Sequence, residues 1–576
     1  MLVSSYLLRL CGNNVETKIY MVWVVVLFGD RMYLMTTKAE TKDGVREYAK
    51  IVESYRDEEG KVRKRVIQNL GPIRSEEDRE RFEQIVEEYE RGENFVRLND
   101  IMLESCREFG ATYAVERLLE EYGIDELVRE KVTDNGAEFD VWKVLRAMLV
   151  KQVLEPSSER ETFEWIEEDY ARDLDINQHH LYRALDYLIS EKEKIERDLF
   201  ERLGKESLLE DMTAFYDLTS SYLEGTVCDL ALYGYSRDHR SDRPQVVLAL
   251  VMMDGMPVMH EVLPGNTLDK TTLEGLVEDL ENNLQVEETV FVADRGLMSE
   301  DNMETCEKVE YPYILGVPRR KNEKAEELLR KEVPGKDSQR ACEIHREEVD
   351  DATRRYVLCL DEKTRKERLE TLDEVREEKQ KELQELKDGF EKSRSREGRG
   401  RPMTKNGAMN RVKKILGKSK RLFDVNIEET IEWELDEEEW NYEQAIAGKF
   451  LLVTTTSLKP NKTMEKYKEL GTVERAFDKI KNSLEIRPIY HYKPHRVKAH
   501  IFLCILGLLI HKIIEKLTDK TAETILKQLK RIHLTELKTP EISRRKLTQS
   551  NSRQEEIFEK LDITPPKELK IQEDLW

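Results

Sequence analysis

The sequence predicts a mixed α/β (α+β) protein in which helical regions flank and interrupt one sheet. The chain has 576 residues, enough for several domains. Charged residues make up 37% and aromatic residues only 7%, a balance typical of soluble, helix-rich proteins. Between residues 213 and 317, runs rich in β-branched and aromatic residues alternate with helical patterns, which indicates strands joined by helices.

Residues 1–31 contain a long apolar run, Ile19–Phe28. This run is about half as long as a bilayer requires, so no membrane role is expected. No small-residue cleavage site follows it, which leaves a signal peptide only weakly supported. The seven cysteines are scattered and form no C-x-x-C pair. That pattern indicates a reducing cytoplasm and argues against both a disulfide framework and a zinc site.

Residues 32–74 are expected to form a basic β-hairpin segment. Residues 44–71 alternate like two strands around a turn at Asp57–Gly60. The hairpin carries four neighbouring cations, namely Lys61, Arg63, Lys64 and Arg65. Two interpretations remain open, a solvated hairpin or a contact with a DNA backbone.

A helical domain is predicted for residues 75–210. Apolar residues recur three and four positions apart there, as in Val141, Val144, Leu145 and Met148. No convincing helix-turn-helix pattern is present in this stretch.

The first part of a sheet-based core is predicted for residues 211–319. A strand around Asp217 is followed by two strands joined at Asp254-Gly255, a hairpin signal. The next elements alternate helix and strand: a helix over 271–284, a strand ending at Asp294, a helix over 299–308 and a strand over 311–317. Three antiparallel strands followed by helix, strand, helix and strand is the order of a ribonuclease H-like core.

Residues 320–447 form a large, helix-rich insertion in this core. The charged run Glu362–Lys392 predicts a helical hairpin or a coiled-coil arm. The segment 392–421 carries twelve Lys or Arg against the single Glu397, a net charge of +11, and its first half is rich in glycine. The whole chain carries −23, so the remainder carries −34 (−23 minus +11). DNA binding must therefore rest on local basic patches, and this segment is either one of them or a solvated arm.

Residues 448–518 complete the core, and residues 519–576 are a polar, helix-leaning tail. A strand over 449–456 precedes one continuous helix from Lys468 to Arg487, which Pro488 ends. A strongly apolar helix over 497–517 closes the core.

One face of the helix before Pro488 carries Tyr467, Glu474 and Lys481, because residues seven apart lie almost above one another. An aromatic ring, a carboxylate and an ammonium group on one face suit metal and phosphate chemistry. The same residues could also form an ordinary solvated helix face.

The spacing of these residues resembles the signature Tyr-(2)-Arg-(3)-Glu-(6)-Lys of one large, IS-four-like branch of DDE transposases from bacterial and archaeal insertion sequences. Leu470 stands where that signature has Arg, which removes a bidentate phosphate contact. Other segments resemble these transposases too: Tyr216-Asp217-Leu-Thr, Gly234-Tyr-Ser-Arg-Asp238 with Gln245, Pro264–Asp269, Ala293-Asp294-Arg295-Gly296, Arg487–His491 and His495–His500. The resemblance covers about Met32 to Lys516 and implies that residues 1–31 come from a start codon assigned too early.

The resemblance implies that Asp217, Asp294 and Glu474 are catalytic and ligate metal. Two Mg²⁺ ions about 4 Å apart are expected, with Mn²⁺ as a substitute. Cationic and aromatic residues expected to contact DNA are Tyr467, Lys481, Arg295, Arg475, Arg487, Arg496, Lys413 and Lys414. Arg295 could instead pair with a catalytic carboxylate.

The function expected from the resemblance is metal-dependent cleavage at the terminal inverted repeats of an insertion sequence, with strand transfer into target DNA. The helical domain would bind the element ends, and the protein would work as a homodimer in the cytoplasm of a prokaryote, associated with the nucleoid. The alternatives are a nuclease on the same fold, a DNA-binding protein that has lost catalysis, and a helical scaffold protein.

Other acidic and histidine residues have plainer interpretations. Asp238, Asp254 and Asp269 are expected to be turn or cap residues. The group His491, His495 and His500 invites a zinc hypothesis, but its spacing matches no standard site and no cysteine pattern accompanies it.

Overall fold

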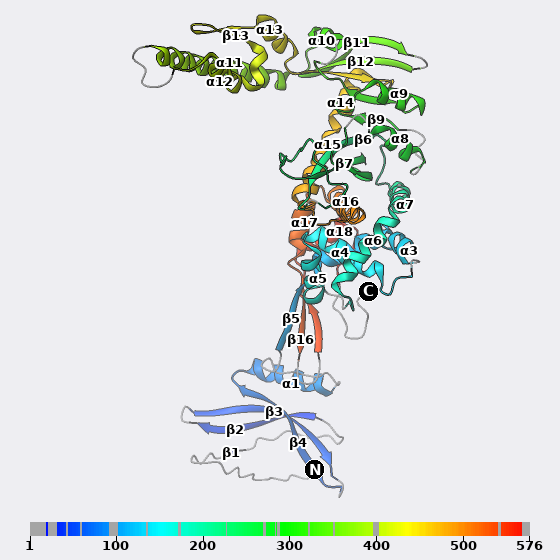
Figure 1. Cartoon of the computed structure of the whole chain (residues 1–576). Helices are drawn as coiled ribbons and strands as arrows, with labels where there is room; N and C mark the ends of the chain where they lie inside the picture. Colours follow the sequence, from blue (N-terminus) through cyan, green and yellow to red (C-terminus); the bar gives the residue numbers. More distant parts are fainter. Residues whose placement is uncertain are drawn as a thin grey trace. The chain divides into compact units, whose positions relative to one another are not determined.

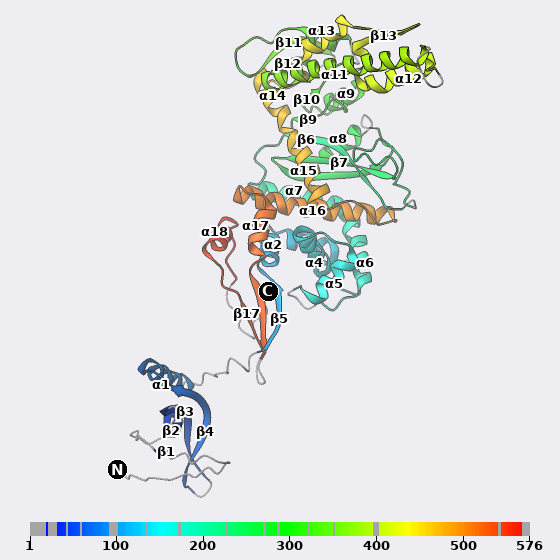
Figure 2. The same cartoon turned by 90° about the vertical axis from the view of Figure 1, so that its left-hand side faces the viewer.

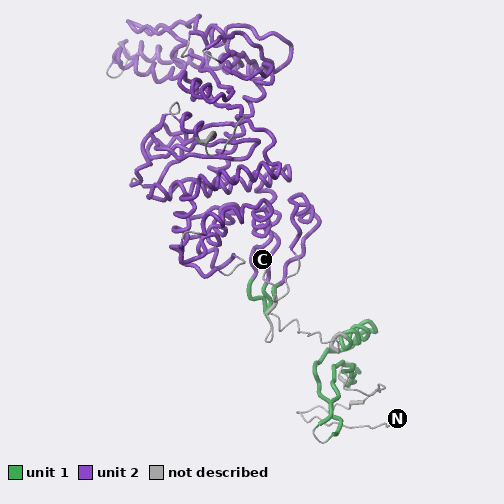
Figure 3. The backbone as a smooth tube through the Cα atoms, turned by 90° about the vertical axis from the view of Figure 1, so that its right-hand side faces the viewer, with its two compact units in different colours: residues 1–105, 536–545 green, residues 106–535, 546–576 purple. Residues whose placement is uncertain are grey.

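The chain forms two compact units in the computed structural model (Figure 3), one of residues 1–105 and 536–545 and the other of residues 106–535 and 546–576. The structure describes residues 19–20, 32–41, 44–57, 60–90, 102–133, 136–170, 174–225, 227–268, 272–282, 284, 289–320, 323–349, 352–395, 402–538 and 543–566. Of residues 1–31, which were expected to come from a start codon assigned too early, only residues 19–20 lie within these ranges. Asp269 lies outside them as well.

The first unit contains an antiparallel sheet rather than a simple hairpin. Its strands are β1 (Ile19–Tyr20), β2 (Met32–Thr41), β3 (Gly44–Arg56) and β4 (Val62–Ile73), in that order, and helix α1 (Glu76–Glu90) packs on the sheet. The predicted hairpin corresponds to β3 and β4. Strand β2 was not predicted, and it pairs with β3 along its whole length. The N-terminal region is therefore not purely helical, because backbone pairing recruits a segment with no clear strand pattern of its own.

The second unit begins within a strand and continues with six helices. Strand β5 (Met102–Glu108) interrupts the stretch predicted to be helical. The helices that follow are α2 (Gly110–Glu121), α3 (Ile124–Thr133), α4 (Val141–Leu154), α5 (Glu159–Glu168), α6 (Gln178–Ser190) and α7 (Lys192–Lys205). Helix α4 is buried on nearly all sides, and its Arg146 is compensated inside the protein by Glu116, Glu120 and Asp125.

The central feature of this unit is a mixed sheet of eight strands, ordered β11-β12-β15-β10-β9-β6-β7-β8 (Figure 1). Its predicted strands are β6 (Ala214–Tyr222), β7 (Gln245–Met253), β8 (Met256–Pro264), β9 (Phe291–Ala293), β10 (Tyr313–Gly316) and β15 (Lys449–Thr454). Helices α8 (Leu273–Asn282) and α9 (Glu300–Lys308) connect β8 to β9 and β9 to β10. The pairs β6–β9 and β9–β10 are parallel and the others antiparallel, so the predicted mixed α/β class is confirmed.

Side chains alternate between the two faces of this sheet, as the period of two in a strand requires. Phe215, Leu248, Val292 and Ile314 belong to one apolar cluster, which includes residues of α14 (Pro460–Glu469) and α15 (Gly471–Asn482). Their strand neighbours belong to a second cluster, which includes residues of α8 and α9. Each face of the sheet thus has its own helical cover.

The insertion contributes to the sheet, which the sequence did not predict. After α10 (Glu323–Arg330), strands β11 (Gln339–Val349) and β12 (Ala352–Asp361) form a hairpin, and β12 pairs with β15. The charged run is a single helix, α11 (Glu362–Arg394), which packs on α12 (Lys405–Leu416). The 3-10 helix η3 (Gly417–Leu422), strands β13 (Phe423–Ile427) and β14 (Ile431–Leu435), and helix α13 (Glu437–Ile446) complete the insertion, which has an apolar cluster of its own.

The helix predicted from Lys468 to Arg487 is two helices. Helix α14 ends at Glu469 and α15 begins at Gly471, with Leu470 as the joint. Around this joint, Leu470 donates its N–H to Tyr467 O and Val473 donates to Leu470 O, so the hydrogen bonding tightens to three residues. Helix α15 ends at Asn482, before Pro488. Tyr467 is therefore on a different helix from Glu474 and Lys481.

Helix α16 (Pro494–Thr518) packs against β8, α4 and α6 (Figure 2). Among the described residues it is the one helix long and apolar enough to cross a membrane, but 83% of its apolar window is buried inside the protein. It serves as a core helix, as predicted.

The predicted polar tail contains packed structure. It comprises α17 (Ala522–Leu529), β16 (His533–Lys538), β17 (Ser543–Leu547) and α18 (Ser552–Lys560), and the strands form a sheet of order β17-β16-β5. Leu526 and Phe558 are buried in the main core. The apolar residues are too widely spaced in this charged segment for its sequence to reveal them as core.

Candidate active site

Two acidic residues are placed side by side by the register of parallel strands. In the β6–β9 pair, Tyr216 lies opposite Ala293, so the next positions along the two strands are Asp217 and Asp294. Neighbouring strands are about 4.8 Å apart. Two residues 77 positions apart in the sequence (294 minus 217) are therefore neighbours in the sheet.

Both carboxylates point to the face covered by α14 and α15. Asp217 is two residues from Phe215 and Asp294 is two residues from Val292, and both apolar residues belong to the cluster on that face. Helix α15 packs against β6 and β7 through Val473, Ala476, Phe477 and Ile480. Glu474 lies on the same helix and reaches the two aspartates.

The three acids line one cavity of about 340 Å³. Its other walls are Leu218, Thr219, Arg237, Gly296, Leu297, Phe477, Asp478 and Lys481. The cavity thus joins carboxylates from a strand, a strand end and a helix, with two cations at its edge. Arg237 and Asp478 were not predicted, although Arg237 lies in the Gly234–Asp238 segment singled out by its sequence.

The electrostatics indicate a crowded cluster of negative charge. Burial raises the pKa of Asp217 to about 6, and the neighbouring carboxylates of Asp294 and Glu474 also raise it. The N–H of Leu218, which donates to Asp217 Oδ1 at 2.8 Å, and the charge of Arg237 act in the opposite direction. Such a cluster favours a bound cation, because a cation relieves the repulsion among the acids.

Tyr467 contacts the acidic cluster directly. Its hydroxyl donates to Asp294 Oδ1 at 3.1 Å, and its ring stacks on Phe450. Burial, and then the charge of Asp294, raise the pKa of Tyr467, so the phenol stays protonated and acts as the donor. The approach depends on Gly316 of β10, where an added Cβ would lie 2.4 Å from the Tyr467 hydroxyl oxygen.

Lys481 is held by Asp238, which corrects the expectation that Asp238 is only a turn residue. Asp238 Oδ1 lies 2.7 Å from Lys481 Nζ and 2.5 Å from Arg487 Nη1, and its side chain is 3% exposed. Lys481 still lines the cavity. In contrast, Asp254 is a turn residue as predicted, with a positive φ of 49° beside Gly255.

The loop that carries Asp238 is fixed by Gln245, another residue of the segments singled out by their sequence. The Gln245 amide donates to the carbonyls of Tyr235 and Gly265. Gly234 packs on Gly265, where a Cβ on Gly234 would lie 2.1 Å from the Gly265 carbonyl oxygen. These contacts explain why glycines and an amide occur at these positions.

The other predicted DNA-contact residues fall into two groups. Arg295, Arg475, Lys413 and Lys414 are exposed, the last two on α12 of the insertion. Arg496 forms two hydrogen bonds with Asp186 on α6, both 2.7 Å long, so in this structure it braces two helices. Leu470, at the position of the signature Arg, is buried and lines a second cavity of about 260 Å³ with Asp294, Tyr467 and Glu474.

The fold and the site define a mixed α/β protein with a carboxylate site suited to divalent metal ions. The donors are all oxygens, which is the set that hard divalent cations prefer.

Comparisons with known proteins identify the family. Residues 217–510 match the transposase DDE domain, and residues 34–99 match the N-terminal domain of IS1634 family transposases. The chain belongs to the DDE transposases, and within them to the IS1634 family. The DDE domain implies divalent metal ions at the site.

Comparisons with curated proteins and with solved structures add less information about the family. No curated protein matches the sequence. Among solved structures, a piggyBac transposase synaptic complex with hairpin DNA, determined by cryo-EM, is similar, with a TM-score of 0.34 and 8% sequence identity. The similarity covers 74% of this chain and 80% of that one.

Proposed function

We propose that this transposase uses Asp217, Asp294 and Glu474 to hold two Mg²⁺ ions, with Mn²⁺ as a working substitute. The observation that carries the proposal is that these three carboxylates, from separate elements, line one cavity. Mg²⁺ prefers a few carboxylates plus substrate oxygens to a complete protein cage. Two bound ions supply a clamp for the attacking and leaving oxygens of an in-line displacement at phosphorus.

The proposed reaction is cleavage at the terminal inverted repeats of an insertion sequence, followed by attack of the released 3′ hydroxyl on target DNA. Tyr467 orients the Asp294 carboxylate through its hydroxyl donor. Lys481 and Arg237, on the cavity wall, bind phosphate oxygens next to the cut. Because Lys481 is paired with Asp238, its ammonium is already positioned before DNA binds.

The proposed fold class and the proposed transposase branch rest on the strand order of the sheet and on the Tyr-Arg-Glu-Lys signature. We infer that β8-β7-β6-β9-β10 is a ribonuclease H-like core, supported by three antiparallel strands followed by two parallel ones. Tyr467 and Lys481, both close to the acids, support membership of the branch with the Tyr-Arg-Glu-Lys signature.

The partners are proposed to be the inverted repeats and target DNA, bound by a homodimer in the synaptic complex. Exposed Arg295, Arg475, Lys413 and Lys414 supply cations for the DNA backbone. The protein is proposed to act in the prokaryotic cytoplasm, associated with the nucleoid.

The test uses the DNA that flanks the gene as the substrate. Wild-type protein or Asp294→Ala is incubated with this DNA and Mg²⁺, and new 3′ ends are mapped. We expect the wild-type protein to cut at the repeat boundaries only when Mg²⁺ is present, and the variant not to cut. The wild-type reaction should also give products in which the cut ends are joined to target DNA.

Each other outcome selects a different function. Specific DNA binding without cutting favours a DNA-binding protein that has lost catalysis. Cutting without joined products favours a nuclease on the same fold. Cuts that persist in Asp294→Ala would show that the active site is elsewhere.

A further inference from the structure

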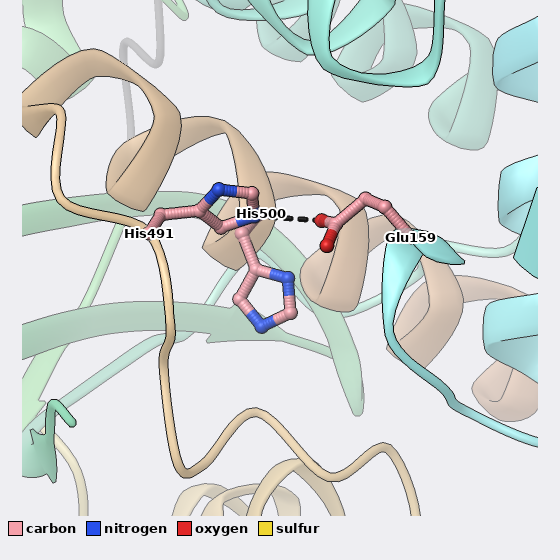
Figure 4. Close-up of side chains that lie close together, drawn as sticks. All are labelled: Glu159, His491 and His500. Atoms are coloured by element: carbon pink, nitrogen blue, oxygen red, sulfur yellow. Dashed lines mark hydrogen bonds and ion pairs between the residues drawn. The ribbon is translucent and has the colours of Figure 1, made fainter. Parts of the chain in front are cut away.

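The side chains of Glu159, His491 and His500 lie close together (Figure 4), although Glu159 is more than 300 residues away from the two histidines in the sequence. Glu159 is the first residue of α5, His491 lies in the segment between α15 and α16, and His500 is on α16. A carboxylate and two imidazoles from three elements form a set of donors that the catalytic cavity does not use.

The donor atoms are close enough to share one metal ion. His491 Nε2 lies 2.7 Å from Glu159 Oε1, and one donor atom from each residue lies within 4.8 Å of the other two. Around a tetrahedral zinc ion with bonds of about 2.0–2.1 Å, donor atoms are about 3.3 Å apart. Small side-chain movements therefore convert the observed cluster into a coordination sphere.

The surroundings also suit a metal ion. The side chains of His491 and Glu159 are only 9% and 17% exposed. His500 also hydrogen-bonds with the backbone of Ile486, the kind of contact that orients a ligating imidazole.

Two neighbours are excluded as ligands. His495, which the sequence grouped with the other two histidines, lies 3.1 Å from Asp186 instead. Cys504 Sγ lies 3.9 Å from His500 Nε2, and it is engaged with the Gln152 amide and the Leu484 carbonyl. The protein thus provides three ligands and leaves a fourth position for water.

We propose that Glu159, His491 and His500 bind a zinc ion that links α5 to the chain on both sides of Pro494. Two imidazoles and one carboxylate are a donor set that zinc accepts. The link fixes the segment that directly follows α15, the helix bearing Glu474 and Lys481. The bound zinc ion thereby strengthens the attachment of the helical region to the segment that follows α15.

The experiment measures zinc in the full-length protein carrying Asp217→Asn and Asp294→Asn, which weakens metal binding at the acidic cavity. The protein is stripped with EDTA, and Zn²⁺ is titrated against a chromophoric chelator. We expect one ion per chain, an affinity lowered at least about 100-fold by Glu159→Gln or His491→Gln, and no change with His495→Gln as the matched control. Saturating zinc should raise the Tm by about 3 °C, and only when the three ligands are present.

A second measurement does not depend on how the variants fold. Co²⁺ added to the stripped protein with all three ligands should give the intense visible bands of a tetrahedral site with nitrogen and oxygen donors. Absence of zinc binding and of these bands, or equal zinc affinity in folded His491→Gln, would overturn the proposal and leave the cluster as a Glu–His ion pair.

Discussion

The raised pKa of Asp217 predicts that this residue destabilises the metal-free protein. Its carboxyl has a pKa of about 6 in the folded state against 3.8 ordinarily, because of burial and of the neighbouring Asp294 and Glu474. At 1.36 kcal/mol per pKa unit, ionising Asp217 in the folded protein costs about 3 kcal/mol. Asp217→Asn removes this charge and keeps an oxygen that can accept from the N–H of Leu218.

The sign of the pH dependence follows from the direction of the shift. Below pH 3.8 the carboxyl is protonated in both states, so the variant gains nothing from losing the charge. Between 3.8 and about 6 the unfolded state ionises first, so the wild-type protein loses stability as the pH rises. Above pH 6 the penalty is complete, and Asp217→Asn should be more stable by about 3 kcal/mol.

The assay is thermal unfolding in EDTA at pH 5 and pH 8. For a unit of several hundred residues, about 3 kcal/mol corresponds to a Tm increase of about 3 °C at pH 8, with a smaller increase at pH 5. Mg²⁺ should then stabilise the wild-type protein more than the variant. Asp478→Asn is the control, because this exposed carboxylate lines the same cavity and should leave the Tm unchanged. Equal Tm values for wild type and Asp217→Asn at pH 8 would falsify the electrostatic argument.

Two other substitutions test how the site is positioned. Gly316→Ala places a methyl group against the Tyr467 hydroxyl and should displace it from Asp294, slowing DNA cleavage about 100-fold in a protein that still folds. Asp238→Asn leaves the buried ammonium of Lys481 without its carboxylate, so urea denaturation should show a stability loss of about 3 kcal/mol, together with weaker cleavage.

Each of these substitutions has a matched control. Gly389→Ala on α11 adds a methyl group that meets nothing within 4 Å, and it should leave cleavage unchanged. Asp242→Asn removes an exposed aspartate from the same loop as Asp238, and it should leave the stability essentially unchanged, because exposed ion pairs contribute little. If Gly316→Ala cleaves DNA at the wild-type rate, Tyr467 does not orient Asp294. If Asp238→Asn is as stable as Asp242→Asn, Lys481 has another partner.

The strands and helices of the core were accessible from sequence because their signals are local. The apolar run before Asp294, the Asp254-Gly255 turn and the stripe of α15 are read within a few residues. The joint at Leu470 is different. No breaker other than Gly471 marks it, and the two helices divide because each packs separately on the sheet.

The pairing of distant segments was not accessible in the same way. Strands β11 and β12 lie in a charged stretch, and they extend the sheet because β15 offers them an open edge. Hydrogen bonds along a sheet edge are satisfied by any compatible backbone, so the side-chain pattern carries little trace of the partner.

The sequence by itself determined the family-like motifs and the strand or helix that carries each of the three predicted acids. Only the tertiary structure decided that Asp238 holds Lys481 across 243 residues and that Glu159 meets His491 across 332. The physical reason is the distance along the chain over which each kind of interaction acts. Backbone propensity and side-chain periodicity act over one or two helical turns, whereas the partner of a buried charge is set by how whole elements pack.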